Sequence, residues 1–465
     1  MEIARGKPLE LHIDSVAFGG PGVARVEGFV VFVKGALPGD RVLARVARKK
    51  RSHAEAVVEE VLTPSPDRVE APCPYFGHCG GCQWQHAKYE SQLSHKKSHV
   101  SDAMARIGML AGVPIRDVIP SAEEYGYRNK MEFSFSRRRW LMPEEMGAAQ
   151  GASEFALGLH VPGTFDKVLD VEACLLQPET GNRILRVVKR FARESGMPAY
   201  EFRSHQGFWR FLTVRRSRHS DAWMVNVITS EENRALLDTM AREVLGPFEN
   251  VVTVVNNITS RKASVAVGER EILLRGAGLI EDRLGPFIFQ ISANSFFQTN
   301  SLTAERLYTQ VKEYAELKGT ELVLDLYSGT GTIPIFLSGS SGNPVVGMEI
   351  NESAVLDAER NCRANGITNC RFVTGDIREA LSTSRLKPDV IVIDPPRSGM
   401  HKDVLLRVME MAAKRIVYVS CNPTTMARDL AGMAEGYEVA ELQPVDMFPQ
   451  TYHVEVVAKL VRKMH

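Results

Sequence analysis

The chain has 465 residues, enough for about two to four domains, and its 44% hydrophobic and 24% charged residues are typical of an ordinary soluble globular protein. Its net charge of +1 gives no support, by itself, for a nucleic-acid partner. No window reaches about 18 uninterrupted apolar residues and the first residues contain no apolar signal core, so we expect no membrane partner and a cytoplasmic monomer.

Residues 1–64 are predicted to form a small all-β unit. Strand-like runs at 9–13, 28–33, 41–46 and 54–61 are separated by glycine- and proline-rich turns, which favours a barrel of the oligonucleotide-binding kind. The pattern of residues 18–25, followed by Leu37-Pro38-Gly39-Asp40, resembles the TRAM domain of RNA-modifying enzymes. Residues 63–67 are expected to be a linker.

Four cysteines have the spacing of a metal site. Cys73, Cys79 and Cys82 lie within ten residues, and Cys174 follows about ninety residues later. Four thiolates suit either tetrahedral zinc or an iron–sulfur cluster. Zinc sites usually consist of two Cys-x-x-Cys pairs, so this spacing favours a [4Fe-4S] cluster, with zinc and four unrelated cysteines as the alternatives.

Residues 65–285 are predicted to form a central α+β domain with a mainly antiparallel sheet. A helix is expected over 86–110, where it can pack on the C-terminal domain, and 143–153 is expected to be a mobile insertion. Strand-like alternation occurs at 130–135, 211–214, 223–229 and 251–257.

Basic residues cluster at 41–51, 128–139 and 203–218, and the second and third clusters are interleaved with aromatic residues. Each cluster taken alone could be a solvated charged face. Together they favour phosphate contacts beside base-stacking platforms, so RNA or another single-stranded nucleic acid is the predicted partner.

Residues 286–465 are predicted to form a doubly wound α/β domain. Helical segments alternate with apolar runs at 321–326, 344–349, 370–374, 388–394 and 415–421, which predicts a parallel sheet with helices on both faces. A glycine loop follows the first strand, and an acid follows each of the next three: Glu349, Asp376 and Asp394, which we expect to contact the cofactor. This order is that of a Rossmann-like S-adenosylmethionine-dependent methyltransferase, and the third glycine of a dinucleotide fingerprint is absent.

The motif Ser420-Cys421-Asn422-Pro423 places a cysteine at the carboxyl end of a buried strand, where ligands collect in open α/β sheets. A buried core cysteine is the alternative. The preceding strand ends in Asp394-Pro395-Pro396-Arg397, which has arginine where methyltransferases of adenine amino groups have an aromatic residue, so methylation of a pyrimidine carbon is considered instead. Carbon 5 of uracil becomes nucleophilic only when a thiolate adds to carbon 6. Cys421 is therefore the candidate nucleophile, and Arg397 is a candidate stabiliser of its ionised form.

A base must then remove the proton from carbon 5. Glu455 is the candidate because its valine neighbours predict burial and a raised pKa, although a solvent-facing strand acid is the alternative reading. His453 is the second candidate for this role.

Motifs along nearly the full length resemble the RNA 5-methyluridine methyltransferases, and most closely their ribosomal members, which combine a TRAM domain, an iron–sulfur domain and a methyltransferase domain. The resemblance implies cofactor contacts from Gln298 in Phe-Phe-Gln-x-Asn, from Tyr327 in Asp-Leu-Tyr-x-Gly, and from Glu349 and Asp394. It also implies Cys421 as nucleophile, Glu455 as base and the four cysteines as cluster ligands. Ser328 stands where many members have cysteine.

The expected activity is therefore S-adenosylmethionine-dependent methylation of uridine carbon 5 in RNA. Ribosomal RNA is favoured over transfer RNA, because the transfer-RNA members that the chain resembles usually lack the TRAM domain and the cluster cysteines. A transfer-RNA enzyme, a non-catalytic RNA-binding factor and a methyltransferase for another base or for protein are the alternatives.

Overall fold

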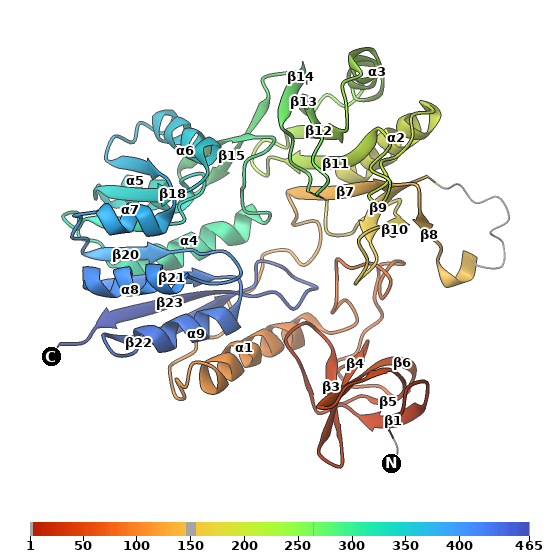
Figure 1. Ribbon diagram of the computed structural model, residues 1–465, viewed down its shortest axis with the longest axis horizontal. Coiled ribbons are helices and arrows are strands. Elements are labelled where there is room, and N and C mark those ends of the chain that lie inside the picture. Colours follow the sequence, from red (N-terminus) through yellow and green to blue (C-terminus); the bar gives the residue numbers. More distant parts are fainter. Residues whose placement is uncertain (1–2, 146–154, 264, 465) are drawn as a thin grey trace.

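The computed structural model describes residues 3–145, 155–263 and 265–464. Three large sheets follow one another along the described chain, with a two-stranded sheet between the second and the third, and the N-terminal one stands apart as a separate lobe (Figure 1). No helix among the described residues combines the length and apolar character needed to cross a bilayer.

The N-terminal sheet has the strand order β1-β5-β6-β4-β3-β2, and its alternating side chains enclose a small core that includes Val31, Val33 and Val42. All four predicted strands are present to within a few residues. The six strands are β1 (Pro8–His12), β2 (Ser15–Val16), β3 (Gly22–Val26), β4 (Phe29–Lys34), β5 (Arg41–Lys49) and β6 (His53–Thr63).

The predicted linker at 63–67 is held firmly to this sheet. The buried carboxylate of Asp40 accepts hydrogen bonds from the backbone N–H groups of Leu37 and Ser65 and pairs with Arg68. These partners outweigh burial and lower the pKa of Asp40. Helix α1 (Tyr89–Arg106) follows and packs against β22 and α9 at the opposite end of the chain.

The central sheet has the order β14-β13-β12-β11-β7-β9-β10-β8 and is antiparallel except where β12 meets β13 and β8 meets β10. Helix α2 (Glu179–Glu194) and α3 (Arg234–Thr239), which continues as a π-helical turn over Met240–Val244, cover it. Of the predicted insertion, Pro143–Glu145 is a short 3-10 turn and the remainder lies outside the described residues. The strands are β7 (Lys130–Ser136), β8 (Arg139–Trp140), β9 (Ala156–His160), β10 (Val168–Asp170), β11 (Trp209–Arg216), β12 (Trp223–Thr229), β13 (Val251–Ile258) and β14 (Arg270–Arg275).

The prediction of a stacking surface at 128–139 and 203–218 is wrong for most of its aromatic residues. The central strands of this sheet are buried on both faces, so five of the predicted rings lie in the interior. None of these five is more than 4% exposed. The guanidinium groups of Arg210 and Arg215 are buried too and donate to backbone carbonyls. The buried rings are those of Phe133, Phe135, Phe208, Trp209 and Phe211.

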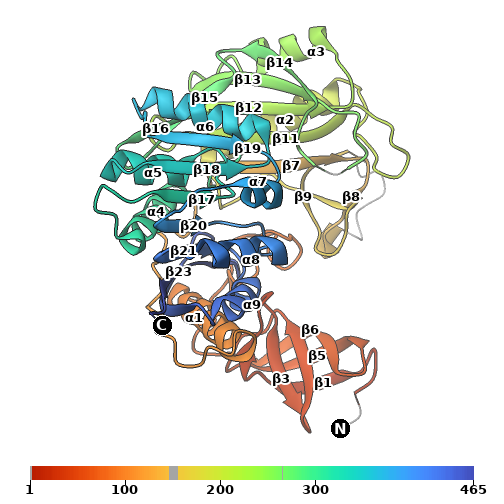
Figure 2. The same ribbon diagram turned by 60° about the vertical axis from the view of Figure 1, so that its left-hand side comes forward.

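The C-terminal sheet has the order β19-β18-β17-β20-β21-β23-β22, with five parallel strands followed by an antiparallel pair. Helices α4, α5 and α6 pack on one face, while α7, α8, α9 and α1 pack on the other (Figure 2). A hairpin of β15 and β16 precedes it. The strands are β15 (Leu279–Leu284), β16 (Phe287–Ser292), β17 (Val323–Leu326), β18 (Val345–Glu349), β19 (Cys370–Thr374), β20 (Val390–Ile393), β21 (Arg415–Ser420), β22 (Tyr437–Val445) and β23 (Glu455–Arg462).

The strand order reverses at β17, which lies between β18 and β20. Ligands of open α/β sheets bind at such a switch point, outside the carboxyl ends of the strands. The helices around it are α4 (Ser301–Ala315), α5 (Thr332–Ser341), α6 (Glu352–Ala364), α7 (Ile377–Thr383), α8 (Lys402–Met411) and α9 (Pro423–Met433).

Candidate active site

A cavity of about 480 Å³ opens at this switch point, at the carboxyl ends of β17, β18, β20 and β21. The segment before α4 and the turn before β23 complete its walls. It brings together eight residues that sequence reasoning had singled out: Gln298, Tyr327, Glu349, Asp394, Arg397, Cys421, His453 and Glu455.

Cys421 lies in the turn between β21 and α9. The Asn422 side chain accepts from the Thr424 backbone N–H and Pro423 occupies the first helical turn, so the helix begins directly after the cysteine. Asn422 also donates to the Arg397 carbonyl at 3.2 Å, which holds the loop after β20 against this turn. Burial raises the pKa of the Cys421 thiol to about 11, Glu455 adds to the shift, and Arg397 opposes it.

Glu455 is the first residue of β23 and is almost fully buried. Burial raises its pKa to about 8, with a further contribution from the nearby carboxyl of Asp394 and opposition from Arg397. Burial likewise raises the pKa of Asp394 to about 7 and lowers that of His453 to about 4. A carboxyl group poised near neutral pH is suited to proton transfer.

The loop after β17 has the shape of a cosubstrate-binding turn. Tyr327 and Gly331 have positive φ angles of 66° and 77°, and a Cβ at position 331 would approach the Ala358 side chain to 2.8 Å, so glycine is required there. The Glu349 carboxylate accepts from the Gly329 backbone N–H at 2.9 Å and from Asn351 at 2.8 Å, which fixes the acid beside the loop.

Asp325, at the end of this strand, was not singled out for a role by sequence reasoning. Its side chain is buried, lines a small cavity of about 40 Å³ with Gln298 and Asp394, and neither carboxylate oxygen has a hydrogen-bond partner among the described residues. Burial raises its pKa well above the usual range. Orphaned buried carboxyls fit a cationic ligand, and S-adenosylmethionine carries a sulfonium and an ammonium group.

Asp376 and Asn300 need separate comment. Asp376 is not among the described residues that line the cavity: it caps α7 and pairs with Arg378, which lowers the pKa of Asp376 to about 2. Asn300, the last residue of the motif Phe-Phe-Gln-x-Asn, had no predicted role. It caps α4 through the Thr303 N–H and donates to the Met447 carbonyl at 3.2 Å.

The four predicted metal ligands line a second cavity, of about 370 Å³, between the central sheet and the loop that follows the N-terminal sheet. The Gly81 N–H donates to the Cys79 sulfur at 3.3 Å, and burial raises the pKa of Cys79 to about 11. Within the described ranges, no three Cys, His, Asp or Glu side chains are close enough together to hold a single metal ion. The buried guanidinium of Arg128 also lines this cavity.

Comparisons with known proteins place this geometry. The model of the family tRNA (Uracil-5-)-methyltransferase matches residues 257–463, and that of the TRAM domain matches residues 4–58. An uncharacterized RNA methyltransferase from Chlorobaculum tepidum is 44% identical over 443 residues, which cover 93% of this chain and 91% of the relative. The chain belongs to the TRAM-containing RNA uracil-5-methyltransferases.

Other relatives of these uracil-5-methyltransferases span the same length. An uncharacterized RNA methyltransferase from Porphyromonas gingivalis is 38% identical and covers 97% of this chain and 99% of its own. The crystal structure of Pyrococcus abyssi tRNA (uracil-54, C5)-methyltransferase in complex with S-adenosyl-L-homocysteine has a TM-score of 0.76 and 29% identity, and the match covers 97% of this chain and 100% of that one.

The predictions of a TRAM unit, of a mixed α/β methyltransferase and of S-adenosylmethionine-dependent uracil-C5 methylation of RNA are therefore confirmed. The alternative of a non-catalytic RNA-binding factor is not supported by these matches.

Proposed function

We propose that this uracil-5-methyltransferase acts through Cys421 as nucleophile and Glu455 as general base. The observation that carries the proposal is that both side chains line one cavity at the switch point, together with Asp394 and the glycine loop. The electrostatic influence of Glu455 on the Cys421 thiol supports their closeness.

In the first step the Cys421 sulfur forms a bond to carbon 6 of uracil, and the electron pair of the 5,6 double bond moves toward the ring carbonyl as an enolate. The sulfur must lose its proton for this attack. Arg397 favours the thiolate, although burial works against it in the free protein. The nearby carboxyl of Asp394, whose pKa is raised to about 7, is suited to take this proton, which leaves Glu455 to take the proton of carbon 5.

Bound S-adenosylmethionine supplies the methyl group from its sulfonium. Carbon 5 then carries both the methyl group and a hydrogen. Glu455 removes that hydrogen as a proton, the electron pair re-forms the double bond, and the bond between carbon 6 and the Cys421 sulfur breaks. The nearly complete burial of Glu455 limits the access of bulk water that would compete for this proton.

We propose that Gln298, Tyr327, Glu349 and Asp394 hold the cosubstrate. Glu349, fixed at the end of β18 by two backbone N–H groups, is placed to accept hydrogen bonds from ribose hydroxyls. The carboxyl groups of Asp325 and Asp394, which line one small cavity with Gln298, are placed to ionise beside the cationic groups of the cosubstrate. The predicted contact from Asp376 stays a prediction.

We also propose that Cys73, Cys79, Cys82 and Cys174 hold a [4Fe-4S] cluster. All four line one cavity of about 370 Å³, and four thiolates are the usual ligand set of such a cluster. The Arg128 side chain lines the same cavity, and its positive charge fits the net negative charge of a thiolate-bound cluster. Such a cluster would stabilise the loop between the N-terminal and central sheets.

For the RNA substrate we propose ribosomal RNA, on the resemblance of the motifs. Transfer RNA is the second candidate, because a transfer-RNA enzyme of 29% identity matches over its whole length. The presence of a TRAM unit therefore does not separate the two substrates.

The test is denaturing gel mobility of the protein after incubation with 5-fluorouridine-substituted RNA and S-adenosylmethionine. Fluorine cannot leave as a proton, so the enzyme should stall as a covalent complex through Cys421. Parallel reactions with ribosomal and transfer RNA identify the substrate, and mapping the crosslink identifies the uridine. Failure of both RNAs to yield a complex, while methyl transfer to unsubstituted RNA continues, would refute the thiolate mechanism.

A further inference from the structure

Residues 446–453, which we call the strap, join β22 to the turn that precedes Glu455. Phe448 and His453 of the strap line the active-site cavity. Other strap side chains, those of Asp446, Gln450 and Thr451, are buried and polar. Buried polar groups need partners, and the partners of the strap come from segments far away in sequence.

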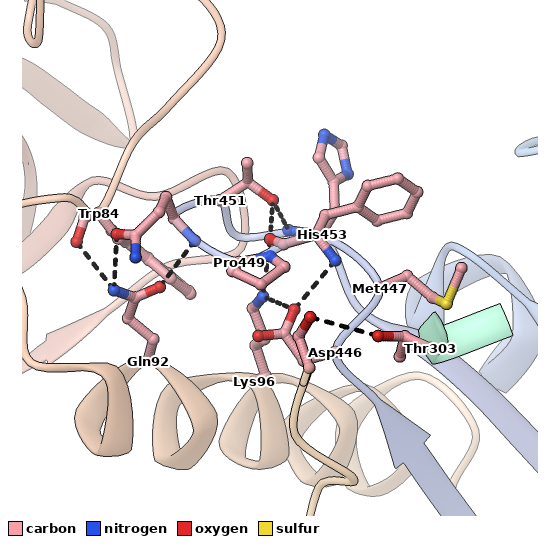
Figure 3. A network of polar contacts seen from close by, with 12 residues as sticks. Trp84, Gln92, Lys96, Thr303, Asp446, Met447, Pro449, Thr451 and His453 are labelled. Atoms are coloured by element: carbon pink, nitrogen blue, oxygen red, sulfur yellow. Dashed lines mark hydrogen bonds and ion pairs between the residues drawn. The ribbon is translucent and has the colours of Figure 1, made fainter. Parts of the chain in front are cut away.

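One set of partners lies on α1. Figure 3 shows Gln92 and Lys96 projecting from this helix toward the strap. Lys96 forms a fully buried ion pair with Asp446 and also donates to the Phe448 carbonyl at 3.1 Å. The Gln92 amide donates to the Gln450 side chain at 3.0 Å and accepts from the Gln450 backbone N–H at 2.9 Å.

A second set of partners comes from the segment directly after the cysteine loop. The backbone N–H groups of Gln83 and Trp84, which directly follow Cys82, both donate to the Gln450 carbonyl, at 2.9 and 3.1 Å. Gln450 has a φ of 69°, a left-handed conformation that is unfavourable for a non-glycine residue and persists only where its surroundings impose it. The segment after the cysteine loop is thus one of the restraints on the strap.

Two neighbours of the cysteine cavity add to the restraint. The Tyr127 hydroxyl donates to the Pro449 carbonyl at 3.2 Å. The Arg128 guanidinium, which lines the cysteine cavity, lies 5.8 Å from the centre of the Phe448 ring. Each contact joins the cysteine side of the molecule to a residue within eight positions of Glu455.

Within the strap, the Thr451 hydroxyl donates to the Phe448 carbonyl and accepts from the His453 N–H, so a shift at Gln450 is transmitted toward the cavity. We infer that the strap is a positioning element that aims Glu455 at the carbon 5 proton, and that the segment after Cys82 sets its shape. This inference rests on the proposed role of Glu455. Cys421 is held by a different turn, so loosening the strap should affect proton removal more than sulfur attack.

The test uses Gln92→Leu, which removes the side-chain contacts with Gln450, and Tyr127→Phe, which removes one hydrogen bond to Pro449. With ordinary uridine RNA, both variants should form the sulfur–carbon bond and transfer the methyl group but release the product slowly. We expect kcat to fall by about tenfold to a hundredfold for Gln92→Leu, with KM for RNA near that of wild type. Methylated RNA should accumulate as a covalent protein adduct on denaturing gels.

The matched control is Tyr437→Phe, which also removes a buried phenol-to-carbonyl hydrogen bond, from Tyr437 to Ala413 at 2.8 Å, but away from the strap. It should show no adduct. The inference is overturned if Tyr127→Phe, with a thermal midpoint like that of the control, shows neither slower release nor adduct. The result for Tyr127→Phe decides the inference even if Gln92→Leu does not fold. Absence of a wild-type complex with 5-fluorouridine RNA would instead refute the proposed function.

Discussion

At the scale of single residues, the site concentrates carboxyl groups where a cation must bind. Asp325 and Glu455 are buried, Asp394 is partly buried, and burial raises the pKa of each carboxyl. A sulfonium and an ammonium group nearby favour the ionised carboxyl, so binding of the cosubstrate should lower these pKa values. The cosubstrate therefore favours an ionised state that burial disfavours in the free protein.

Substitutions of the two proposed catalytic residues should have different effects on the covalent complex between protein and RNA. Cys421→Ala should abolish both turnover and covalent complex formation, because no other sulfur-containing side chain is among the described residues that line the cavity. Glu455→Gln should still form the sulfur–carbon bond but lower kcat by about a hundredfold to ten-thousandfold, with methylated RNA trapped on the protein. Gel mobility with radiolabelled methyl groups distinguishes the two. Full activity in Cys421→Ala would contradict the mechanism.

The raised pKa of Glu455 also predicts how stability changes with pH. The folded protein holds this proton to about pH 8, whereas the unfolded chain loses it near the ordinary value for glutamate. The stability linked to this proton is present at low pH and is lost as pH rises through about 8. In urea unfolding of the cosubstrate-free protein, the free energy of unfolding should fall as the pH rises toward about 8, and this fall should be smaller in Glu455→Gln. An identical decline in both would exclude Glu455 as its source.

At the scale of elements, α1 is attached to the C-terminal sheet by a charged contact inside a hydrophobic interface. Breaking the buried Lys96–Asp446 pair with Lys96→Met leaves an unpaired carboxylate, which should lower the free energy of unfolding by about 3–5 kcal/mol. Adding Asp446→Asn removes that charge and should restore part of the loss. Urea titrations of the three proteins measure this, and equal stability of the single and double variants would contradict the argument.

The loop that carries three of the cysteines should affect the strap if it holds the proposed cluster. In Cys73→Ser, amide hydrogen exchange of residues 446–453 should be faster than in the wild-type protein loaded with the proposed cluster, because the N–H donors of Gln83 and Trp84 lose their anchor. Exchange of β17 should not change. Unchanged exchange in the strap, with the cluster demonstrably lost, would show that the two segments are independent.

The elements themselves were largely predictable, since the strands of the N-terminal and C-terminal sheets follow from alternation, apolar runs and turn residues. The cavity was predictable because the ends of parallel strands meet at one edge. What the sequence could not reveal was which faces were covered: Phe133 and Trp209 are periodic with basic neighbours, yet the second face of their sheet is buried. The strap was also hidden, because its partners Gln92 and Gln83 lie more than 350 positions away in the chain.

At the scale of the whole molecule, the N-terminal lobe presents exposed cations that the folded core does not use. Arg48, Lys49 and Arg51 are exposed at the turn between β5 and β6. Replacing all three with serine should weaken RNA binding and reduce the slope of log affinity against log salt by about 2 to 3, with kcat at saturating RNA unchanged. Filter binding at several salt concentrations measures the slope.

The control for this experiment replaces three exposed cations at the amino ends of the parallel strands, opposite the cavity: Lys318, Lys414 and Arg462. An equal loss of slope in the control variant would mean that the effect reflects net charge alone.

The pairing of Lys96 with Asp446 across 350 residues also has a consequence for synthesis of the chain. At about 5–20 residues per second, roughly 20 to 70 s pass between translation of α1 and translation of its counterion. During that interval the helix has neither β22 nor α9 to cover its apolar side, so it remains exposed on the nascent polypeptide. The last fifteenth of the chain to leave the ribosome therefore completes the docking of a helix made in the first quarter. A ribosome that stalls late would release a protein whose cysteine loop and catalytic cavity are both unfinished.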